Sequence, residues 1–177
     1  MEIFDLDLDG VKVITPKVFH DTRGYLLESY NTKISEALGV NFIQDNESFS
    51  LKDVFRGLHY QLSPHDQNKL IRCIYGEVVD YVVDIRKNSP TFGKWVSFTI
   101  SSDNKHQIFC PAGFAHGFFV LSQTARVLYK VDKPYNHEHD RNIHALDPDI
   151  NLDLDDNIHL SGKDKTAPFL RDIKNKL

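Results

Sequence analysis

The stretch KLIRCIYGEVVDYVVDI, residues 69–85, decides the fold of this chain. It contains two runs, residues 69–75 and 78–85, that are rich in isoleucine, valine and tyrosine and lie on either side of Gly76. Branched and aromatic side chains favour strands, and a glycine between two such runs favours a turn. The stretch therefore predicts two consecutive β-strands.

Runs of the same kind recur on both sides of this pair, with Gly, Pro, Asn and Asp between them. They are residues 11–15, 25–30, 95–100, 107–110, 117–121 and 125–131. Short strands at such regular spacing predict an all-β fold, either a sandwich or a closed barrel.

The parts outside these runs predict little further regular structure. Residues 33–38 favour a short helix that Gly39 would end. From Tyr135 onwards Asp and Asn are common, so we expect loops and short helical turns that wrap the barrel. Since no linker, repeat or low-complexity stretch divides the chain, we expect one domain spanning residues 1–177.

The bulk composition excludes several classes of protein. The chain has 177 residues, 41% of them hydrophobic, and a net charge of −4 without a basic run. Double-stranded nucleic acid is therefore disfavoured as a partner, because binding it requires clustered Lys and Arg. No apolar run is long enough to span a membrane. Cys73 and Cys110 lie in apolar stretches and the N-terminus does not resemble a signal peptide, so we expect reduced thiols in a cytoplasmic protein.

His59 lies in the run RGLHYQ, residues 56–61, ten residues before Lys69. In a regular strand, alternation would put Arg56 and His59 on opposite faces. Gly57 makes a bulge plausible, and a bulge would bring the two side chains to one side. The competing interpretation is a hydrogen-bonded barrel histidine beside a surface arginine.

Other candidates for chemistry are scattered along the chain. His116 lies in PAGFAHGF, residues 111–118, and would suit either a barrel mouth or the core. Tyr129 and Tyr135 are each consistent with ordinary aromatic packing, although a tyrosine can also act as an acid. Asp164 lies between two lysines, typical of a solvated segment. If it returned to a barrel histidine, it would fix the tautomer of that ring.

Metal binding is the obvious alternative chemistry for a barrel of this kind. Jelly-roll metal sites often use two histidines at i and i+2, but Gln61 occupies the second position after His59. His137-Glu138-His139 has that spacing within a polar stretch after Pro134, which favours a solvated loop. We therefore expect no metal. The chain also has no G-x-G-x-x-G or Walker loop for a dinucleotide or ATP.

Two polar clusters, HDTRG at residues 20–24 and QDNES at residues 44–48, are typical of turns when taken singly. Together with other segments they resemble the dTDP-4-dehydrorhamnose 3,5-epimerase family, whose members have a cupin-type jelly-roll barrel. The matching segments follow the family's order and cover nearly the whole chain. They are DTRG (21–24), QDNES (44–48), RGLHYQ (56–61), KL (69–70), VDIR (83–86), SPTFGKW (89–95), PAGFAHGF (111–118), LYK (128–130) and LSGKD (160–164).

The resemblance implies an enzyme that acts on a nucleotide diphosphate 4-keto-6-deoxyhexose without a cofactor. The C4 carbonyl acidifies the hydrogens on C3 and C5. His59, oriented by Asp164, would remove a proton as general base. Lys69 would stabilise the enolate, and Tyr129 would return a proton from the opposite face.

The resemblance also implies a substrate-binding set and a homodimer in which N-terminal strands are exchanged. Arg56 would bind near the diphosphate, and Tyr135 near the base. His116 and Asp80 would line the sugar pocket. The positions expected around the nucleotide and its phosphates, some of them serving the neighbouring subunit, are Arg23, Glu28, Gln44 and Asn46.

Three departures from the family's pattern leave alternatives open. Leu26 replaces an aromatic residue beside the base, and residues 142–148 and 153–156 lack tryptophans that are common in the family. These changes bear on nucleotide choice and on whether C5 is inverted as well as C3. The alternatives are a 3-epimerase acting on a related sugar, a keto-isomerase, a metal-dependent oxygenase and a non-catalytic ligand-binding cupin.

Overall fold

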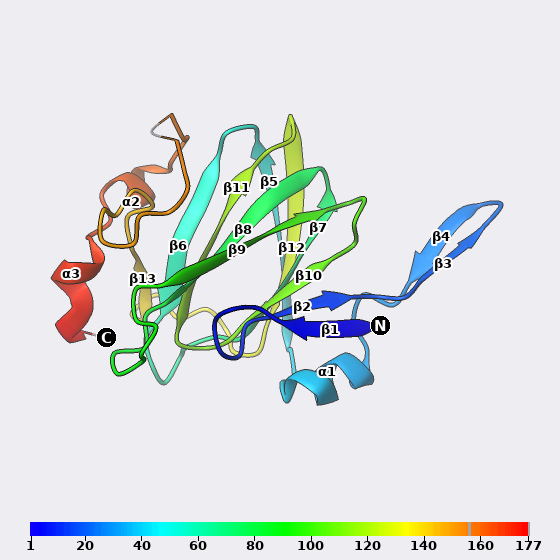
Figure 1. The fold of residues 1–177 in the computed structure, drawn as a ribbon, viewed down its shortest axis with the longest axis horizontal. Coiled ribbons are helices and arrows are strands. Elements are labelled where there is room, and N and C mark those ends of the chain that lie inside the picture. The colour runs from blue at the N-terminus through cyan, green and yellow to red at the C-terminus, as the bar shows by residue number, and fades with distance from the viewer. Residues whose placement is uncertain (156, 177) are drawn as a thin grey trace.

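The structure, a computed structural model, describes residues 1–155 and 157–176. Asp156, the last residue of the 153–156 segment, lies outside this description. The strands form two facing sheets and a separate hairpin that projects from the body of the molecule (Figure 1). The hairpin consists of β3 (Val18–Asp21) and β4 (Gly24–Leu27).

Every strand pairing in the two sheets is antiparallel. The six-stranded sheet has the order β1 (Glu2–Asp5), β2 (Lys12–Thr15), β10 (Gln107–Cys110), β7 (Lys69–Tyr75), β12 (Thr124–Val131) and β5 (Gln44–Leu51). The five-stranded sheet has the order β13 (Asp140–Asn142), β6 (Phe55–Gln61), β11 (Phe114–Val120), β8 (Glu77–Asp84) and β9 (Trp95–Ser101). From β5 to β13 the chain changes sheet at every step except between β8 and β9. This topology confirms the predicted jelly roll.

The short helices lie at the periphery, as predicted. They are α1 (Thr32–Leu38), α2 (Gly162–Lys165), α3 (Leu170–Ile173) and the 3₁₀ turn η1 (Lys174–Lys176). The side chain of Asn31 accepts a hydrogen bond from the backbone N–H of Ile34 and caps the start of α1. Gly39 ends α1 with a φ of 65°, a conformation that glycine adopts without a steric penalty.

The strand prediction was incomplete. The runs at 69–75 and 107–110 match β7 and β10, whereas β1, β3, β5 and β13 were missed. The cluster QDNES was assigned to a turn but begins β5, a strand at the edge of its sheet. Polar side chains dominate β5 because one face meets solvent and the other a polar pocket. Strand β11 starts at Phe114, three residues before the predicted run.

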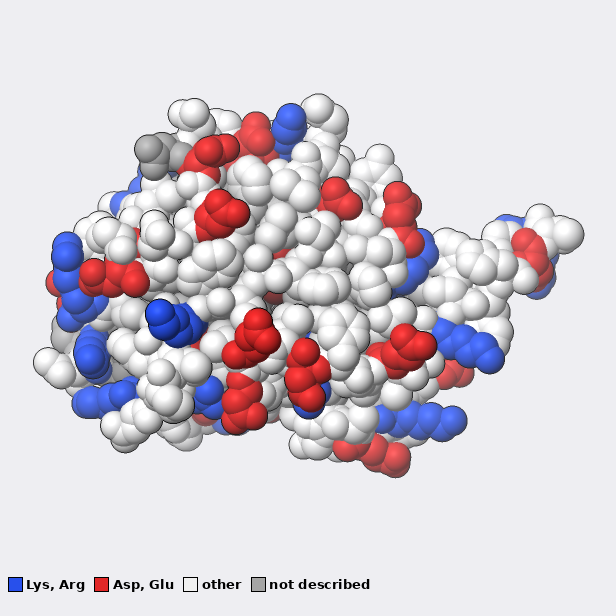
Figure 2. All heavy atoms as spheres, in the orientation of Figure 1, with Lys and Arg blue, Asp and Glu red and all other residues white. Residues whose placement is uncertain are grey.

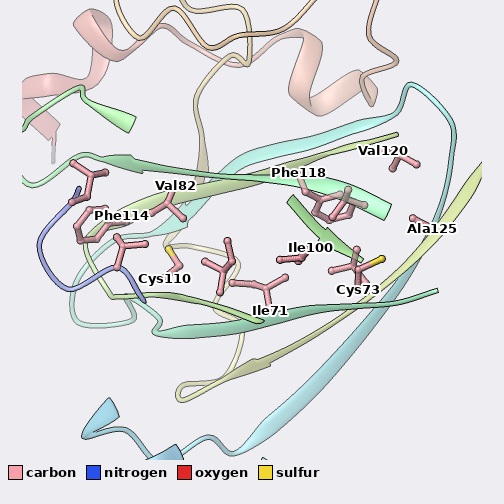
Figure 3. Packing of buried hydrophobic residues seen from close by; sticks show 14 residues of the cluster. Ile71, Cys73, Val82, Ile100, Cys110, Phe114, Phe118, Val120 and Ala125 are labelled. Carbon is pink, nitrogen blue, oxygen red and sulfur yellow. The ribbon is translucent and has the colours of Figure 1, made fainter. Parts of the chain in front are cut away.

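The main core lies between the two sheets (Figure 3). Ile71 and Cys73 enter it from the six-stranded sheet, and Val82 and Phe118 enter it from the five-stranded sheet. The side chains come from every second residue of their strands, as expected for sheets that each bury one face. Cys73 and Cys110 are both buried free thiols.

The outer faces of both sheets are also covered. Ile34 of α1 packs on Leu70 and Phe109, behind the six-stranded sheet. The C-terminal segment covers the five-stranded sheet, where Ile143 and Leu170 join the cluster behind it. Asp147 anchors that segment, because its carboxylate accepts hydrogen bonds from the backbone N–H groups of Asp149, Ile150 and Leu170. This docking brings α2 against the edge of the barrel.

A bulge at Gly57 interrupts the pairing of β6 with β11. His116 pairs with His59 and Phe118 pairs with Arg56, so β6 has one extra residue in this interval. Gly57 has a φ of 137°, and a Cβ there would lie 2.5 Å from Cα of Gly117. Only glycine fits such a close approach of two backbones. The bulge is therefore confirmed, and it changes which side chains of β6 share a face.

Within residues 1–155 and 157–176, no helix is long and apolar enough to cross a membrane.

Candidate active site

A polar pocket lies where polar side chains interrupt or extend the apolar rows of the core. On β8, Asp80 takes the place between Val78 and Val82, and on β7, Lys69 continues the row of Ile71 and Cys73. The pocket has a volume of about 290 Å³. Its lining residues are Ser48, Arg56, His59, Tyr60, Gln61, Gln67, Lys69, His116, Phe118, Tyr129, Tyr135, Asp140 and Lys163. The inward face of the barrel thus changes from hydrophobic packing to a site that can bind a polar ligand.

His59 forms a hydrogen-bonded pair with Asp164. Nε2 of His59 lies 2.7 Å from Oδ1 of Asp164, although the two residues are 105 positions apart in the chain. The His59 side chain is 39% exposed, whereas the Asp164 side chain is 4% exposed. The ring therefore faces the pocket while its carboxylate partner lies beneath it. An ionised partner at Nε2 favours the tautomer with the proton on that nitrogen and leaves the Nδ1 lone pair free to act as a base.

Asp164 remains ionised despite its burial. Burial alone would raise the pKa of this carboxyl, but hydrogen bonds from His59 and Ser161 outweigh that effect. The pKa of Asp164 accordingly lies below its usual range. A carboxylate in this state can orient the imidazole and stabilise the imidazolium that forms when the ring takes up a proton.

Lys69 and Tyr129 face this pair from the other sheet. Nζ of Lys69 donates to the backbone carbonyl of His59 at 3.3 Å, so the lysine bridges the two sheets at the pocket. Burial lowers the pKa of Lys69, and the nearby Cys110, Asp140 and Asp80 oppose that shift. Burial also raises the pKa of Tyr129, so its hydroxyl keeps a proton to donate at neutral pH.

A second histidine–carboxylate pair lies deeper in the same pocket. Nε2 of His116 lies 2.8 Å from Oδ2 of Asp80, and the Asp80 side chain is fully buried. Burial raises the pKa of Asp80, and the neighbouring His116 and Lys69 oppose that shift. Oδ1 of Asp80 has no hydrogen-bond partner among the described residues. Both histidines singled out in the sequence therefore line one pocket.

Arg56 lies on the same side of β6 as His59 because of the bulge at Gly57. Its Nε donates to Oγ of Ser50 at 2.7 Å, and its Nη2 donates to the carbonyl of Phe49 at 3.0 Å. Both acceptors belong to β5. The guanidinium is thus held across the gap between the sheets, where it lines the pocket.

The rim holds an acidic and a basic residue that the sequence did not reveal as site residues, Asp140 and Lys163. Oδ2 of Asp140 accepts hydrogen bonds from Nζ of Lys163 and from the Tyr135 hydroxyl, the latter at 3.1 Å. Lys163 directly precedes Asp164, so the same docking of α2 that completes the histidine pair also delivers this lysine. The only feature of the sequence that pointed to Lys163 as a site residue was its position next to Asp164.

Gln44 and Asn46 lie next to the pocket on β5. Asn46 pairs across the strands with Tyr129, and Ser48, two residues further on, lines the pocket. Nε2 of Gln44 donates to Oδ1 of Asn46 at 2.9 Å. Alternation puts Gln44, Asn46 and Ser48 on one face of the strand, so the first two extend the polar lining outwards.

Arg23 and Glu28 lie away from this pocket. Arg23 is at the tip of the projecting hairpin, where its Nη2 lies 2.6 Å from Oδ2 of Asp21 and its side chain is 88% exposed. Glu28 follows the hairpin and accepts a hydrogen bond from the Asn31 side chain. The described part of the chain does not bring either residue to its own pocket.

The loop His137-Glu138-His139 lies between β12 and β13. Nδ1 of His139 lies 2.9 Å from Oδ1 of Asn136, and its ring packs on His65 with a centroid distance of 4.4 Å. Over the described parts of the chain, no group of three or more His, Cys, Asp or Glu side chains is placed to hold a metal ion.

Charges of both signs are scattered over the face seen in Figure 2, and the basic side chains form no continuous patch there. This distribution agrees with the even spread of charge along the sequence.

The jelly roll is of the cupin type, and its histidine–carboxylate pair and tyrosine around one pocket are groups capable of acid–base chemistry. Over residues 5–172 the chain matches the family described as dTDP-4-dehydrorhamnose 3,5-epimerase. The chain belongs to this family, and it is an isomerase of the carbohydrate epimerase type.

Individual relatives agree over most of their length. A dTDP-4-dehydrorhamnose 3,5-epimerase of Shigella flexneri is 50% identical over 86% of both chains. That of Salmonella typhimurium is 45% identical over 96% of both chains. The crystal structure of a dTDP-6-deoxy-D-glucose-3,5-epimerase from Legionella pneumophila, in complex with dTDP-4-keto-L-rhamnose, is 44% identical. It superimposes with a TM-score of 0.94 and covers 99% of this chain and 95% of that one.

Proposed function

We propose that this chain converts dTDP-4-dehydro-6-deoxy-D-glucose to dTDP-4-dehydro-L-rhamnose by inverting C3 and C5, with His59 as base and Tyr129 as acid. The observation that carries this proposal is the placement of the two side chains on opposite sheets around one pocket. Inversion requires a proton to leave one face of the sugar and another to arrive on the opposite face. A base and an acid on opposite walls meet that requirement.

In the first step, Nδ1 of His59 takes the proton from C3. The electron pair of the C–H bond moves into the ring to form an enolate, with negative charge on O4 of the former ketone. Asp164 stabilises the imidazolium that results. Its short hydrogen bond to Nε2 supports this role.

In the second step, the enolate oxygen is stabilised and carbon is reprotonated. Lys69, which lines the pocket, can donate a hydrogen bond to O4. Tyr129 then delivers its proton to C3 from the face opposite His59. Water returns a proton to the tyrosinate and removes one from the imidazolium, and the same cycle at C5 completes the product.

The nucleotide diphosphate would occupy the outer part of the pocket. Arg56 and Lys163 provide positive charge there, and Tyr135 on the rim provides an aromatic ring for the base. Gln44 and Asn46 lie on the face of β5 that borders the pocket, and they can donate hydrogen bonds to the nucleotide. Asp140 keeps Lys163 and the Tyr135 hydroxyl in place through its hydrogen bonds to both.

Solvent labelling tests the reaction and its positions together. The enzyme is incubated in deuterated water with dTDP-4-dehydro-6-deoxy-D-glucose, and the product is analysed by NMR. We expect deuterium at both C3 and C5 of the product, because each centre receives its new proton from a group that equilibrates with solvent. Label at C3 alone would contradict inversion of C5 and indicate a 3-epimerase. Absence of label from both carbons would contradict catalysis.

We also propose a homodimer in which the β3–β4 hairpin reaches the pocket of the partner subunit. The hairpin projects from the body (Figure 1), and its Phe19, Tyr25 and Leu26 side chains are half exposed or more. Apolar side chains on a projecting hairpin favour an interface. The exchange would bring Arg23 and Glu28 to a pocket that their own chain does not let them reach.

Mixing two inactive variants tests this dimer. Arg23→Ala lacks the donated arginine and His59→Ala lacks the base, so we expect each alone to be strongly impaired. After the two are mixed and allowed to exchange subunits, one pocket of each mixed dimer has both residues intact, which restores about a quarter of the pockets. Sedimentation equilibrium provides the mass of the assembly. A monomer, or no recovery on mixing, would contradict the exchange.

The chain works, we propose, as one domain in the cytoplasm. Trp95 of β9 donates to the carbonyl of Ile150, and Leu170 donates to Asp147, so the C-terminal segment is bonded to the sheet and to itself. The free thiols of Cys73 and Cys110 support a reducing compartment. For a single domain we expect one cooperative unfolding transition. For a cytoplasmic protein we expect recovery of the enzyme in the cytoplasmic fraction.

A further inference from the structure

We propose that Ser161 is a positioning residue for the reaction, because it holds the Asp164 carboxylate in the orientation that the His59 ring requires. This inference rests on the proposed function, in which His59 is the base.

One hydroxyl makes two contacts with the same residue. Oγ of Ser161 accepts the backbone N–H of Asp164 at 3.1 Å and caps the start of α2. The same Oγ donates its proton to Oδ2 of Asp164 at 2.8 Å. Backbone and side chain of Asp164 are therefore fixed by a single group three positions earlier in the chain.

The two oxygens of Asp164 are consequently assigned to different partners. Oδ2 faces Ser161, and Oδ1 faces Nε2 of His59 at 2.7 Å. Rotation of the carboxylate would break both hydrogen bonds together. The hydroxyl thus fixes the direction of the bond that sets the tautomer of His59.

The charge of Asp164 also depends on this contact. The carboxylate is almost completely buried, and burial alone would raise its pKa. Hydrogen bonds from His59 and Ser161 lower it, with a further contribution from Asn142. Without the hydroxyl, the buried Oδ2 would lose a donor, and the ionised form that stabilises the imidazolium would become less favourable.

Removal of the hydroxyl tests the role. We expect Ser161→Ala to lower kcat by about 10- to 100-fold, the range for a lost hydrogen bond to a charged group, and to change KM by less than about twofold. The ¹⁵N shifts of the His59 ring should move from one tautomer towards a mixture. Ser161→Thr retains a hydroxyl and should restore both kcat and the tautomer.

A second variant separates this role from simple capping. Glycine is nearly as good a cap as serine, so Ser161→Gly preserves the start of α2 while it removes the hydroxyl. The kcat of Ser161→Gly should fall as far as that of Ser161→Ala, and the His59 tautomer should shift in the same way. The matched control is Ser122→Ala, because Ser122 also accepts a backbone N–H and donates to a neighbour, but lies in the β11–β12 turn outside the pocket. We expect this control to have the parent's kcat and tautomer.

Two outcomes would overturn the inference. One is a kcat and a His59 tautomer in Ser161→Gly equal to those of the parent, and the other is failure of Ser161→Thr to recover activity while it remains folded. Either result would leave the proposed function intact, provided that His59→Ala is inactive. Near-normal turnover by His59→Ala would instead contradict the proposed function itself.

Discussion

Replacement of His59 by alanine is expected to lower the turnover of the keto-sugar by roughly 10³- to 10⁴-fold, the contribution of a well-placed general base. Deuterium exchange at C3 and C5 should disappear in the same proportion, because His59 is the proposed base and the other histidine of the pocket, His116, is buried against Asp80. The side chain is 39% exposed, so its loss leaves no buried cavity. We expect the melting temperature to change by only a few degrees. Turnover and exchange are measured by NMR in deuterated water.

Two variants make this expectation specific. Asp164→Asn keeps the shape of the carboxylate but removes its charge, and should impair exchange almost as severely, because it no longer favours the productive tautomer. His137→Ala removes an exposed histidine outside the pocket and should be fully active. An active His59→Ala, or an inactive His137→Ala that is still folded, would contradict the assignment of the base.

Replacement of Tyr129 by phenylalanine is expected to separate proton removal from inversion. His59 can still take the proton from C3, and its half-exposed ring can exchange that proton with water. Without the tyrosine hydroxyl, the proposed acid on the opposite wall is missing. The starting sugar should therefore acquire deuterium at C3 with retained configuration, while inversion falls by about 10²- to 10⁴-fold.

The measurement compares deuterium uptake into the remaining substrate with formation of the inverted product. Tyr81→Phe is the matched control, because it removes the hydroxyl of a buried tyrosine that donates to the carbonyl of Asp153 outside the pocket. It should invert C3 at the parent's rate. Equal loss of exchange and inversion in Tyr129→Phe would contradict its role as the second acid and indicate that it only positions the substrate.

Strand β5 shows where sequence patterns mislead. Its segment QDNES reads as a turn because it is polar, but in the sheet Asn46 pairs with Tyr129 and Ser48 lines the pocket. Polar side chains on the inner face of a strand are uncommon in a core, and here they occur because that face borders a pocket for a polar ligand. A local pattern cannot distinguish this case from a loop.

Asp140 and Lys163 show a second limit. Neither belongs to a hydrophobic period, and they come from segments more than 20 residues apart. They meet because β13 pairs with β6 and because α2 docks near the same edge. Contacts of this kind arise from docking of the C-terminal segment, which depends on packing over the whole five-stranded sheet.

The sequence by itself determined the strand-rich class, the two consecutive strands β7 and β8 and the helix that ends at Gly39, and it made a bulge at Gly57 plausible. Each of these depends on side-chain volume, branching or backbone freedom within a few neighbouring residues. The resemblance of the sequence to a family indicated which residues are the candidate base, acid and orienting carboxylate. Only the tertiary structure decided that His59 meets Asp164 at 2.7 Å, that Tyr129 stands on the opposite wall, and that Arg23 stays outside its own pocket. Those distances depend on how two sheets face each other and where the last helices dock, which no short stretch of sequence specifies.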